Sequence, residues 1–373
     1  MTQCKHIAVF LGHPAHYHMF KHVVAELEGQ GVRVDFLVKR KDILEELVQR
    51  SGHFYHVVRP HERGAKGKLG LAWTLLSMEM RVTAYLLRNR PQLLIGTYAP
   101  VFSHLTGVPM IVCCEDDTSV VPRFARTSYP YAAAILAPRC CDGGAWDAKM
   151  IKYDGFQKLA YLHPNRFVPE WEKVQPYLRD ASRPFVLMRF AKLQAHHDDQ
   201  IKGMTNEVAL RLIEKLSPTY DVYLSSERPL SPELESYRLH IDPLEIHHWL
   251  AFASIYLGDS QSMALEAAVL GTPSLRFNDF AGRIGVLEEL EHKYRLTFAI
   301  PSSEPERLFA KLDELLAQPN LRETFQQRRQ RMLSEKIDVS AFFAWFVENY
   351  PDSQTVMKEH PDYQLRFKSQ RDV

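Results

Sequence analysis

The chain has 373 residues, of which 46% are hydrophobic and 24% are charged, and its formal net charge is +1. This length is too great for one compact core and suits two domains of ordinary size, and the composition is typical of a soluble globular protein. A net charge near zero provides no overall field that would attract nucleic acid or an anionic membrane, so we expect no nucleic-acid partner.

The N-terminus and the cysteines indicate where the protein works. The opening residues Met1-Thr-Gln-Cys-Lys-His lack the charged-then-apolar pattern of a signal peptide, which predicts a cytoplasmic protein. Two adjacent pairs, Cys113-Cys114 and Cys140-Cys141, lack the two-residue gap of a zinc knuckle. We therefore expect free, buried thiols.

The first half of the chain alternates strands and helices. The predicted strands are 6–11, 32–38, 54–58, 93–96, 109–113 and 133–136, and the predicted helices are 17–28, 42–50 and 69–88. Such alternation requires right-handed crossovers and predicts a parallel sheet covered on both faces.

The longest apolar stretch, 69–87, approaches the length that crosses a membrane. Glu79 and Arg81 lie near its middle, where a charge is costly in a bilayer. We therefore predict an amphipathic helix whose apolar face packs on the first sheet. A membrane-surface or lipid-acceptor role is the alternative, so peripheral membrane contact stays open.

The pattern of alternation stops at a proline-rich segment, 164–183, and then restarts. The second half has predicted strands at 185–189, 221–224, 253–257, 274–277 and 296–300, and predicted helices at 206–215, 245–251, 263–270, 305–317, 321–334 and 340–348. The polar tail after Pro351 is expected to be extended or frayed.

These patterns predict four segments. Residues 1–163 form an N-terminal Rossmann-like domain and 164–183 form a linker. Residues 184–338 form a C-terminal Rossmann-like domain. Residues 339–373 form a helix that returns to the N-terminal domain, followed by the tail.

The stretch 256–277 is a strand, a turn, a helix and a second strand. Ligands sit at the carboxyl ends of parallel strands, and the free amides at a helix start attract anions. The candidate phosphate-binding residues at this turn are Asp259, Ser260, Gln261, Ser262 and Met263. Glu266, about one helical turn later, can accept hydrogen bonds from two sugar hydroxyls, which together describes a nucleotide site. The alternative is that Ser260 only caps the helix and Glu266 is only a solvated carboxylate.

A second motif, Gly12-His-Pro-Ala-His-Tyr-His18, follows the first strand. It is not a dinucleotide fingerprint, because the Gly-x-Gly-x-x-Gly pattern is missing. Gly12 is a candidate substrate-binding residue, and His13, His16 and His18 are candidate general bases. The glutamate of a zinc-protease helix is absent between His18 and His22, so we predict no metal here.

Further candidates follow other strand ends. In Glu115-Asp116-Asp117, one carboxylate can deprotonate an acceptor hydroxyl, unless the turn is merely solvated or caps a helix. Arg189 and His196 can neutralise a departing diphosphate, the charge that most needs stabilising when no metal is present. The alternative for Arg189 is an interdomain salt bridge. Ser225 ends another predicted strand and is a candidate contact to base or ribose.

The C-terminal motif resembles a known one. Gly258-Asp-Ser-Gln-Ser-Met, with Glu266-Ala-Ala and Gly271-Thr-Pro after it, resembles the donor-nucleotide motif of GT-B glycosyltransferases and of hydrolysing UDP-N-acetylglucosamine 2-epimerases. The resemblance implies that the loop holds the diphosphate and that the glutamate holds the ribose.

A broader resemblance covers most of the chain. The Gly12 motif, the block 153–167, the block from Arg189 to Asp198 and the donor motif are similar, in order, to motifs of an uncharacterised archaeal and bacterial family of predicted glycosyltransferases related to the 2-epimerases. The chain departs from that family at Gln261-Ser262, where relatives often carry glycines, and at Cys113-Cys114-Glu115. The resemblance implies a GT-B fold, in which two doubly wound domains face each other across a cleft.

Together these observations predict an enzyme that uses a nucleotide sugar, UDP-linked by resemblance. The expected reaction transfers the sugar to a sugar, glycan or lipid-linked acceptor. An Asp-x-Asp metal site is absent from the sequence, so we expect neither metal nor another cofactor. The alternatives are a 2-epimerase, which needs no acceptor, and a non-catalytic nucleotide-sugar-binding protein.

Overall fold

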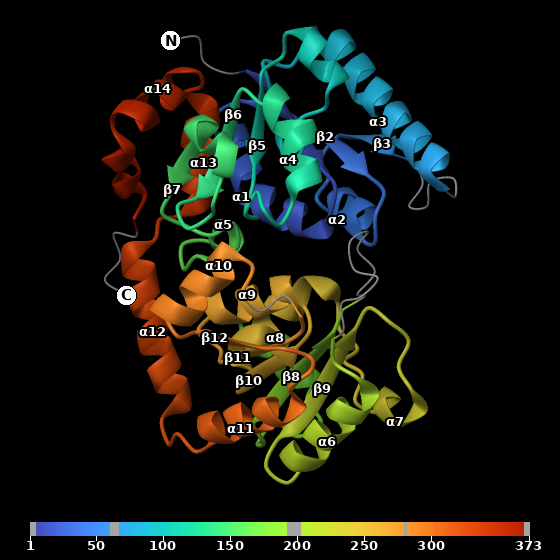
Figure 1. Cartoon of the computed structure of the whole chain (residues 1–373), viewed down its shortest axis with the longest axis vertical. Coiled ribbons are helices and arrows are strands. Elements are labelled where there is room, and N and C mark those ends of the chain that lie inside the picture. Colours follow the sequence, from blue (N-terminus) through green and yellow to red (C-terminus); the bar gives the residue numbers. More distant parts are fainter. Residues whose placement is uncertain (1–4, 60–66, 192–202, 280–281, 369–373) are drawn as a thin grey trace. The chain divides into compact units, whose positions relative to one another are not determined.

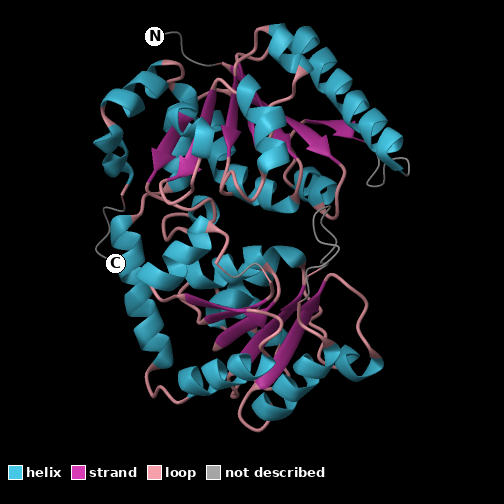
Figure 2. Cartoon of the chain, in the orientation of Figure 1, coloured by secondary structure: helices cyan, strands magenta, loops and turns pink. Residues whose placement is uncertain are grey.

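The computed structural model describes residues 5–59, 67–191, 203–279 and 282–368 (Figure 1). The chain divides into two compact units, Met1–Arg166 with Lys336–Asp372, and Phe167–Glu335, which we call unit 1 and unit 2. Each unit contains one all-parallel sheet with helices around it, so the predicted α/β class is confirmed (Figure 2).

Unit 1 is built on a seven-stranded sheet in the order β3-β2-β1-β4-β5-β6-β7. Its strands are β1 (His6–Leu11), β2 (Arg33–Lys39), β3 (Tyr55–Arg59), β4 (Leu93–Gly96), β5 (Met110–Cys113), β6 (Ala134–Pro138) and β7 (Met150–Tyr153). Its helices are α1 (Pro14–Gly29), α2 (Leu44–Arg50), α3 (Gly67–Asn89), α4 (Pro122–Ser128), α5 (Leu159–Leu162), α13 (Val339–Glu348) and α14 (Asp352–Glu359). Short 3-10 turns are η1 (Phe102–Thr106), η2 (Tyr129–Tyr131), η3 (Gly144–Lys149) and η8 (Pro361–Phe367). The sequence prediction missed β7, in which Lys152 interrupts the apolar run.

The sheet of unit 1 is buried on both faces, which explains its nearly continuous apolar strands. On one face, Phe10 and Val112 pack in a core with Val82 and Leu86 of α3. These contacts of α3 confirm the predicted packing of the 69–88 helix on the first sheet. Elsewhere in unit 1, helices α1, α5 and α13 pack together, and Ser340 of α13 donates to the carbonyl of Ala160 at 2.6 Å.

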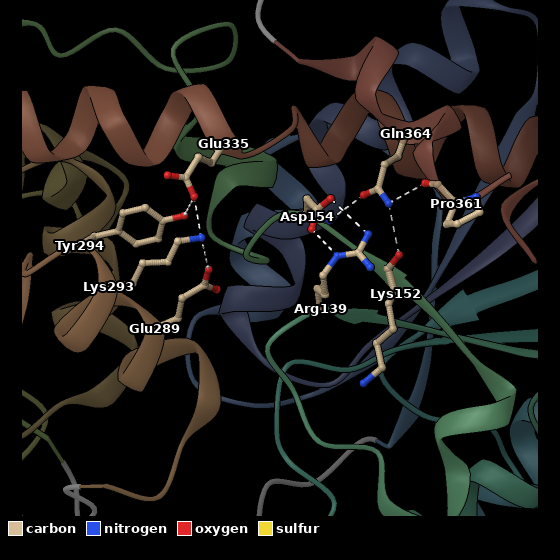
Figure 3. A network of polar contacts seen from close by, with 9 residues as sticks. All are labelled: Arg139, Lys152, Asp154, Glu289, Lys293, Tyr294, Glu335, Pro361 and Gln364. Atoms are coloured by element: carbon tan, nitrogen blue, oxygen red, sulfur yellow. Dashed lines mark hydrogen bonds and ion pairs between the residues drawn. The ribbon is translucent and has the colours of Figure 1, made fainter.

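The C-terminal tail is ordered, so the prediction of an extended or frayed end is wrong. Residues after Pro351 form α14 and η8, and Tyr363 stacks on Trp345 with ring centroids 4.6 Å apart. Gln364 is fully buried, and Figure 3 shows its side chain between Asp154 and Pro361. Its Oε1 accepts from the amide of Asp154 at 2.6 Å, and its Nε2 donates to the carbonyl of Pro361 at 2.8 Å. Aromatic stacking and this polar bridge hold the segment, and neither produces a periodic pattern.

Replacing Gln364 tests this bridge. We expect Gln364→Ala to lower the free energy of unfolding by about 1–3 kcal/mol, because the Asp154 amide loses its acceptor in a partly buried position. Urea unfolding followed by circular dichroism measures the change. Lys358→Ala, which removes an exposed side chain of α14, should change stability by less than about 0.5 kcal/mol. Equal effects of the two substitutions would contradict the bridge.

Unit 2 is built on a five-stranded sheet in the order β12-β11-β10-β8-β9. Its strands are β8 (Phe185–Phe190), β9 (Asp221–Ser226), β10 (Ile255–Gly258), β11 (Ser274–Phe277) and β12 (Thr297–Ile300). Its helices are α6 (Asn206–Leu216), α7 (Pro232–Glu235), α8 (Ile246–Phe252), α9 (Gln261–Val269), α10 (Gly285–Glu288), α11 (Pro305–Leu316) and α12 (Leu321–Glu335). The remaining turns are η4 (Trp171–Lys173), η5 (Gln175–Tyr177), η6 (Pro243–Glu245) and the π-turn η7 (Glu289–Lys293).

Two details of unit 2 concern its ends. Within the segment predicted as a linker, residues from Phe167 onward belong to unit 2, and Trp171 packs edge-on against Phe252 with centroids 5.1 Å apart. At the other end, the carboxylate of Glu335 pairs with Nζ of Lys293 at 2.5 Å and accepts a hydrogen bond from the Tyr294 hydroxyl at 2.8 Å (Figure 3). These contacts fix the end of α12 to η7. Among the helices of the described segments, none combines the length and apolar character needed to cross a membrane.

Candidate functional site

Both sheets have a topological switch point, where the chain leaves a central strand in one direction and later returns on the other side. In unit 1 this point lies between β1 and β4, and in unit 2 it lies between β8 and β10. Ligands of open α/β sheets bind outside the carboxyl ends of the strands at such points. The turn after β1 carries His13, the turn after β8 begins with Ala191, and the turn after β10 carries Asp259.

A glycine at each switch point lets two backbones approach closely. A Cβ atom on Gly96 would lie 2.7 Å from the carbonyl oxygen of Phe10, and one on Gly258 would lie 2.7 Å from that of Arg189. Both distances are shorter than van der Waals contact, so any larger residue would push the central strands apart.

The start of α9 has the features of an anion site. Ser260 is the N-cap, with an extended backbone, and its side-chain oxygen accepts from the amide of Met263 at 3.4 Å. The amides of Gln261 and Ser262 lie in the first turn, where a helix offers them no acceptor, and Ser262 is exposed. An anion in front of α9 would meet these amides and the positive end of the helix dipole.

Asp259 has a different position from the one expected of a ligand contact. It is buried, with Oδ1 accepting from the amide of Ala191 at 2.6 Å and Oδ2 from that of Met204 at 3.1 Å. Desolvation raises the pKa of this carboxyl group. Its two oxygens thus hold the segments that follow β8, which makes Asp259 a positioning residue.

The side chain of Gln261 is also held within unit 2. Its Nε2 donates to Oδ1 of Asn278 at 2.8 Å, and its Oε1 accepts from Arg276 at 3.3 Å. Arg276 is itself buried and paired with Glu291 at 2.7 Å. The glutamine that stands where the resembling families often carry glycine is therefore directed toward the end of β11, and its main-chain amide stays at the helix start.

Glu266 lies one turn into α9, four residues after exposed Ser262 and on the same helical face. Its side chain is buried, and its Oε1 lies 3.5 Å from Nε2 of His247 in α8. Sequence reasoning missed His247. The sequence signal for it is the adjacent pair His247-His248 on a predicted helix. Adjacent residues of a helix point in different directions, so the two histidines are expected to contact different neighbours. His248 is used elsewhere and accepts from the amide of Glu170 at 2.9 Å.

Arg189 and Ser225 come together at the carboxyl ends of β8 and β9. The guanidinium donates to the Ser225 hydroxyl at 2.6 Å and to the carboxylate of Glu227. Its Nε is buried and has no hydrogen-bond partner among the residues that the structure describes. The carboxylate that pairs with Arg189 belongs to the same unit. His196, the other predicted cation, lies outside the described residues.

In unit 1, His16 is held as a neutral hydrogen-bond donor. Its Nδ1 is 3.1 Å from the amide of Gly12, which donates to it, and 3.1 Å from the hydroxyl of Thr97. A ring nitrogen that accepts carries no proton, so Nε2 carries it. Burial, and then the charges of His13 and Lys158, lower the pKa of His16 to about 3. His16 can therefore offer Nε2–H to an oxygen atom, which does not suit the predicted role of general base.

The other predicted histidines have structural contacts. His13 is the N-cap of α1, and its Nδ1 accepts from the amide of Ala15 at 3.2 Å. Its ring lies 5.9 Å from that of His16. His18 packs against Tyr161 of α5, with ring centroids 5.5 Å apart. The amide of Gly12 is occupied by His16, so Gly12 shapes the turn rather than offering that amide to a substrate.

The three acidic residues after β5 are in different environments. Glu115 accepts from the amide of Gln157 at 2.6 Å and lies 3.4 Å from Nζ of Lys158. Asp117 is buried and accepts from the amide of Asp142 at 2.6 Å. Asp116 is exposed, and its carboxylate makes no hydrogen bond to any residue that the structure describes. It is thus the carboxylate of the three that remains available to a ligand.

The pKa of Asp116 is raised above the usual value for an aspartate. Desolvation by the surrounding protein, followed by the charge of Glu115, raises it to about 6, and Lys158 opposes the rise. An exposed side chain can still be partly desolvated when it sits among protein atoms at a strand end. Sequence reasoning missed Lys158, a buried residue before α5, although it lies in one of the resembling blocks.

The half-buried, neutral imidazole of His16 predicts a dependence of stability on pH. The pKa of folded His16 lies below the unfolded value of 6.5, so below pH 6.5 the unfolded state binds a proton that the folded state does not bind. Between pH 7 and pH 5 this difference lowers the free energy of unfolding by about 2 kcal/mol. Urea unfolding at both pH values should show a smaller decrease in the free energy of unfolding for His16→Gln than for the wild type. The exposed His240→Gln should behave like the wild type, and identical losses in all three would contradict the assignment.

The described parts of the chain contain free thiols and no metal-binding cluster. Within those parts, no group of three histidine, cysteine, aspartate or glutamate side chains is arranged to hold a metal ion. The cysteines there are free thiols, and Cys113, Cys114 and Cys141 are buried. Burial raises the pKa of Cys114 to about 11, which keeps that thiol protonated and unreactive.

A scan of protein-family models and a search of curated protein sequences gave no match to this chain. Solved structures do match. The glycotransferase of kitacinnamycin is 15% identical, with 92% of this chain and 98% of that chain covered and a TM-score of 0.59. A UDP-N-acetylglucosamine 2-epimerase is 15% identical, with 100% and 99% covered and a TM-score of 0.61.

A third structure, UDP-GlcNAc 2-epimerase from Neisseria meningitidis bound to UDP-GlcNAc, is 14% identical, with 87% of this chain and 94% of that chain covered and a TM-score of 0.59. All three are enzymes. At these identities the likeness concerns the fold alone, and the chain has the GT-B type of fold that glycosyltransferases and UDP-GlcNAc 2-epimerases share.

Proposed function

We propose that this protein binds a nucleotide sugar, with UDP as the nucleotide, and transfers the sugar to an acceptor hydroxyl. The observation that carries the proposal is the switch point of unit 2, where the capped start of α9 is followed by buried Glu266. Amides at a helix start suit a diphosphate, and a carboxylate one turn later suits the two hydroxyls of a ribose.

In the transfer, the bond between the anomeric carbon and the diphosphate oxygen breaks, and the electron pair leaves with UDP. The acceptor oxygen forms the new bond to that carbon and gives up its proton. The charge that develops on UDP would be stabilised by the amides of Gln261 and Ser262, and by Arg189 through its guanidinium. No step of this scheme needs a metal ion.

Unit 1 carries the candidate acid–base group. Asp116 is available and has a pKa raised to about 6, so it can accept the acceptor proton near neutral pH. His16 would hold an oxygen of the acceptor or the sugar through Nε2–H. Thr97 and Gly12 keep that imidazole in place at the switch point of unit 1.

The same carboxylate supports a second candidate, epimerisation at carbon 2 of the sugar. There Asp116 would remove the proton at carbon 2 as UDP leaves, and UDP would add back after the proton returns on the other face. The raised pKa of Asp116 suits proton abstraction as well as it suits base catalysis of transfer.

Two experiments test the proposal. The first is a thermal-shift series with UDP, ADP, GDP and UDP-sugars, in which a ligand at a hundred times its dissociation constant adds about 2.7 kcal/mol of stability. No stabilisation by any of them would remove the nucleotide site. The second incubates the stabilising donor in deuterated water without an acceptor. Deuterium in the sugar would assign epimerisation, and product formed only with an added acceptor would assign transfer.

A further inference from the structure

Helix α3 is apolar on two opposite faces. Its inner face contributes Met78, Val82, Tyr85 and Leu86 to the core of unit 1. Its outer face carries large apolar side chains that are exposed, namely Trp73 (64%), Leu76 (36%), Met80 (48%) and Leu87 (58%). Spacings of three, four and seven residues place these four along one stripe of the helix. The inner face explains the fold, and the outer face has no role in it.

The adjoining turn η1 extends the apolar stripe. Its Phe102 and Leu105 are exposed by 42% and 82%. The turn is fixed to α3, because the Ser103 hydroxyl lies 3.2 Å from that of Thr83 and the Phe102 amide donates to Glu79 at 3.2 Å. We call the six residues Trp73, Leu76, Met80, Leu87, Phe102 and Leu105 the outer patch. Single exposed apolar residues are ordinary on protein surfaces, but a contiguous group marks an interaction surface.

The charges beside the outer patch are positive. Arg81 and Arg88 of α3 are both exposed. Glu79 is the one acidic residue in the sequence of α3, and it is buried, where it accepts from the Tyr98 hydroxyl and the Phe102 amide. Residues 97–113, which include η1, contain no acidic residue. The patch therefore combines apolar side chains with a cationic border and no exposed carboxylate of its own.

We propose that the outer patch docks on the surface of a lipid bilayer that contains anionic lipids. Apolar side chains of a helix that lies in the membrane plane enter the boundary between headgroups and acyl chains, and arginines beside them meet lipid phosphates. Trp73 has the amphipathic ring that favours this boundary. In Figure 1, α3 runs along the outer side of unit 1, where its outer face is turned away from the sheet.

Charge also decides against a second copy of the chain as the occupant. A symmetric dimer through the outer patch would bring Arg81 and Arg88 of both copies together, and α3 offers no exposed carboxylate to pair with them. An anionic bilayer supplies the missing negative charge. The proposal stands apart from the proposed function, because it requires neither nucleotide binding nor catalysis.

Vesicle flotation tests the proposal with three variants. Trp73→Ser with Met80→Ser removes apolar contacts, and Arg81→Glu with Arg88→Glu reverses the border charge. Leu210→Ser is the control, because Leu210 of α6 is 37% exposed and lies outside the patch. We expect the wild type and the control to float with vesicles of phosphatidylcholine and phosphatidylglycerol. The serine variant should bind at least about tenfold less, and the glutamate variant should lose the preference for phosphatidylglycerol over phosphatidylcholine alone.

Several results would overturn the proposal. These are no flotation of the wild type, equal flotation of the serine variant, or flotation that does not weaken when salt is raised. Sedimentation equilibrium adds another: a dimer that the serine variant abolishes, without vesicle binding by the wild type, would assign the outer patch to self-association. The substituted side chains are exposed, so circular dichroism should show unchanged folding. Trp73→Ser alone serves as the test if the double variant unfolds.

Discussion

Asp116→Asn is expected to lower turnover by about 10²–10⁴-fold, because it removes the carboxylate that accepts the substrate proton. The substitution keeps the size of the side chain, and the carboxylate of Asp116 makes no hydrogen bond within the described structure, so the fold and the affinity for UDP should not change. Initial rates, together with UDP titration by calorimetry, separate turnover from binding. Asp362→Asn, at an exposed position of η8, is the matched control and should leave both unchanged.

The pH dependence provides an independent readout of the same residue. Asp116 must be deprotonated to act as a base, so the rate should rise with pH and level off above its pKa of about 6. Lys158 lowers that pKa, so Lys158→Met should raise it and move the rising limb of the profile to higher pH. The variant should then lose activity at pH 6 and regain most of it at pH 8. A profile that does not move, or an active Asp116→Asn, would assign the proton transfer to another group.

Glu266→Ala is expected to weaken UDP binding by about 1.5–3 kcal/mol, or roughly 10- to 150-fold in the dissociation constant, because hydrogen bonds to a charged group are lost. The side chain is buried beside His247, so water should not fully replace the hydrogen bonds that the carboxylate makes to the ribose. Calorimetric titration with UDP measures the effect.

Two companions make this result specific. Glu214→Ala removes an exposed glutamate of α6 and should bind UDP like the wild type. His247→Ala removes the neighbour that lies 3.5 Å from Glu266, and a smaller loss of affinity is expected if it only positions that carboxylate. Unchanged UDP affinity in Glu266→Ala would remove the donor-site assignment altogether.

Much of the fold could be predicted because parallel strands buried on both faces are continuous apolar runs. The strands 6–11, 93–96 and 274–277 were predicted with the bounds that the structure has. The short strand β7 and the helix α14 were not predicted, because their order comes from tertiary contacts such as the burial of Gln364. A local pattern of apolar and polar residues does not predict contacts between residues about 200 positions apart in the sequence.

The candidate site was predictable only in part, for a related reason. Strand ends located the turns that carry His16, Asp116 and Ser260, because carboxyl ends of parallel strands share one edge of a sheet. The state of each side chain depends on distant partners. The amide of Gly12 decides which nitrogen of His16 carries the proton, and the amides of Ala191 and Met204 turn Asp259 from a ligand contact into a positioning residue. The sequence alone therefore identifies the candidate side chains but does not determine their hydrogen-bond partners or protonation states.

The return of the C-terminal helices to unit 1 affects how the protein is made. Ser340 bonds to Ala160 and Phe343 packs on Tyr153, so part of the helical layer that covers the first sheet comes from residues that follow unit 2 in the sequence. Unit 2 lies wholly within an interruption of unit 1 and can complete its core during synthesis. Until those helices are made, the nascent first half therefore exposes the apolar surface that α13 later covers.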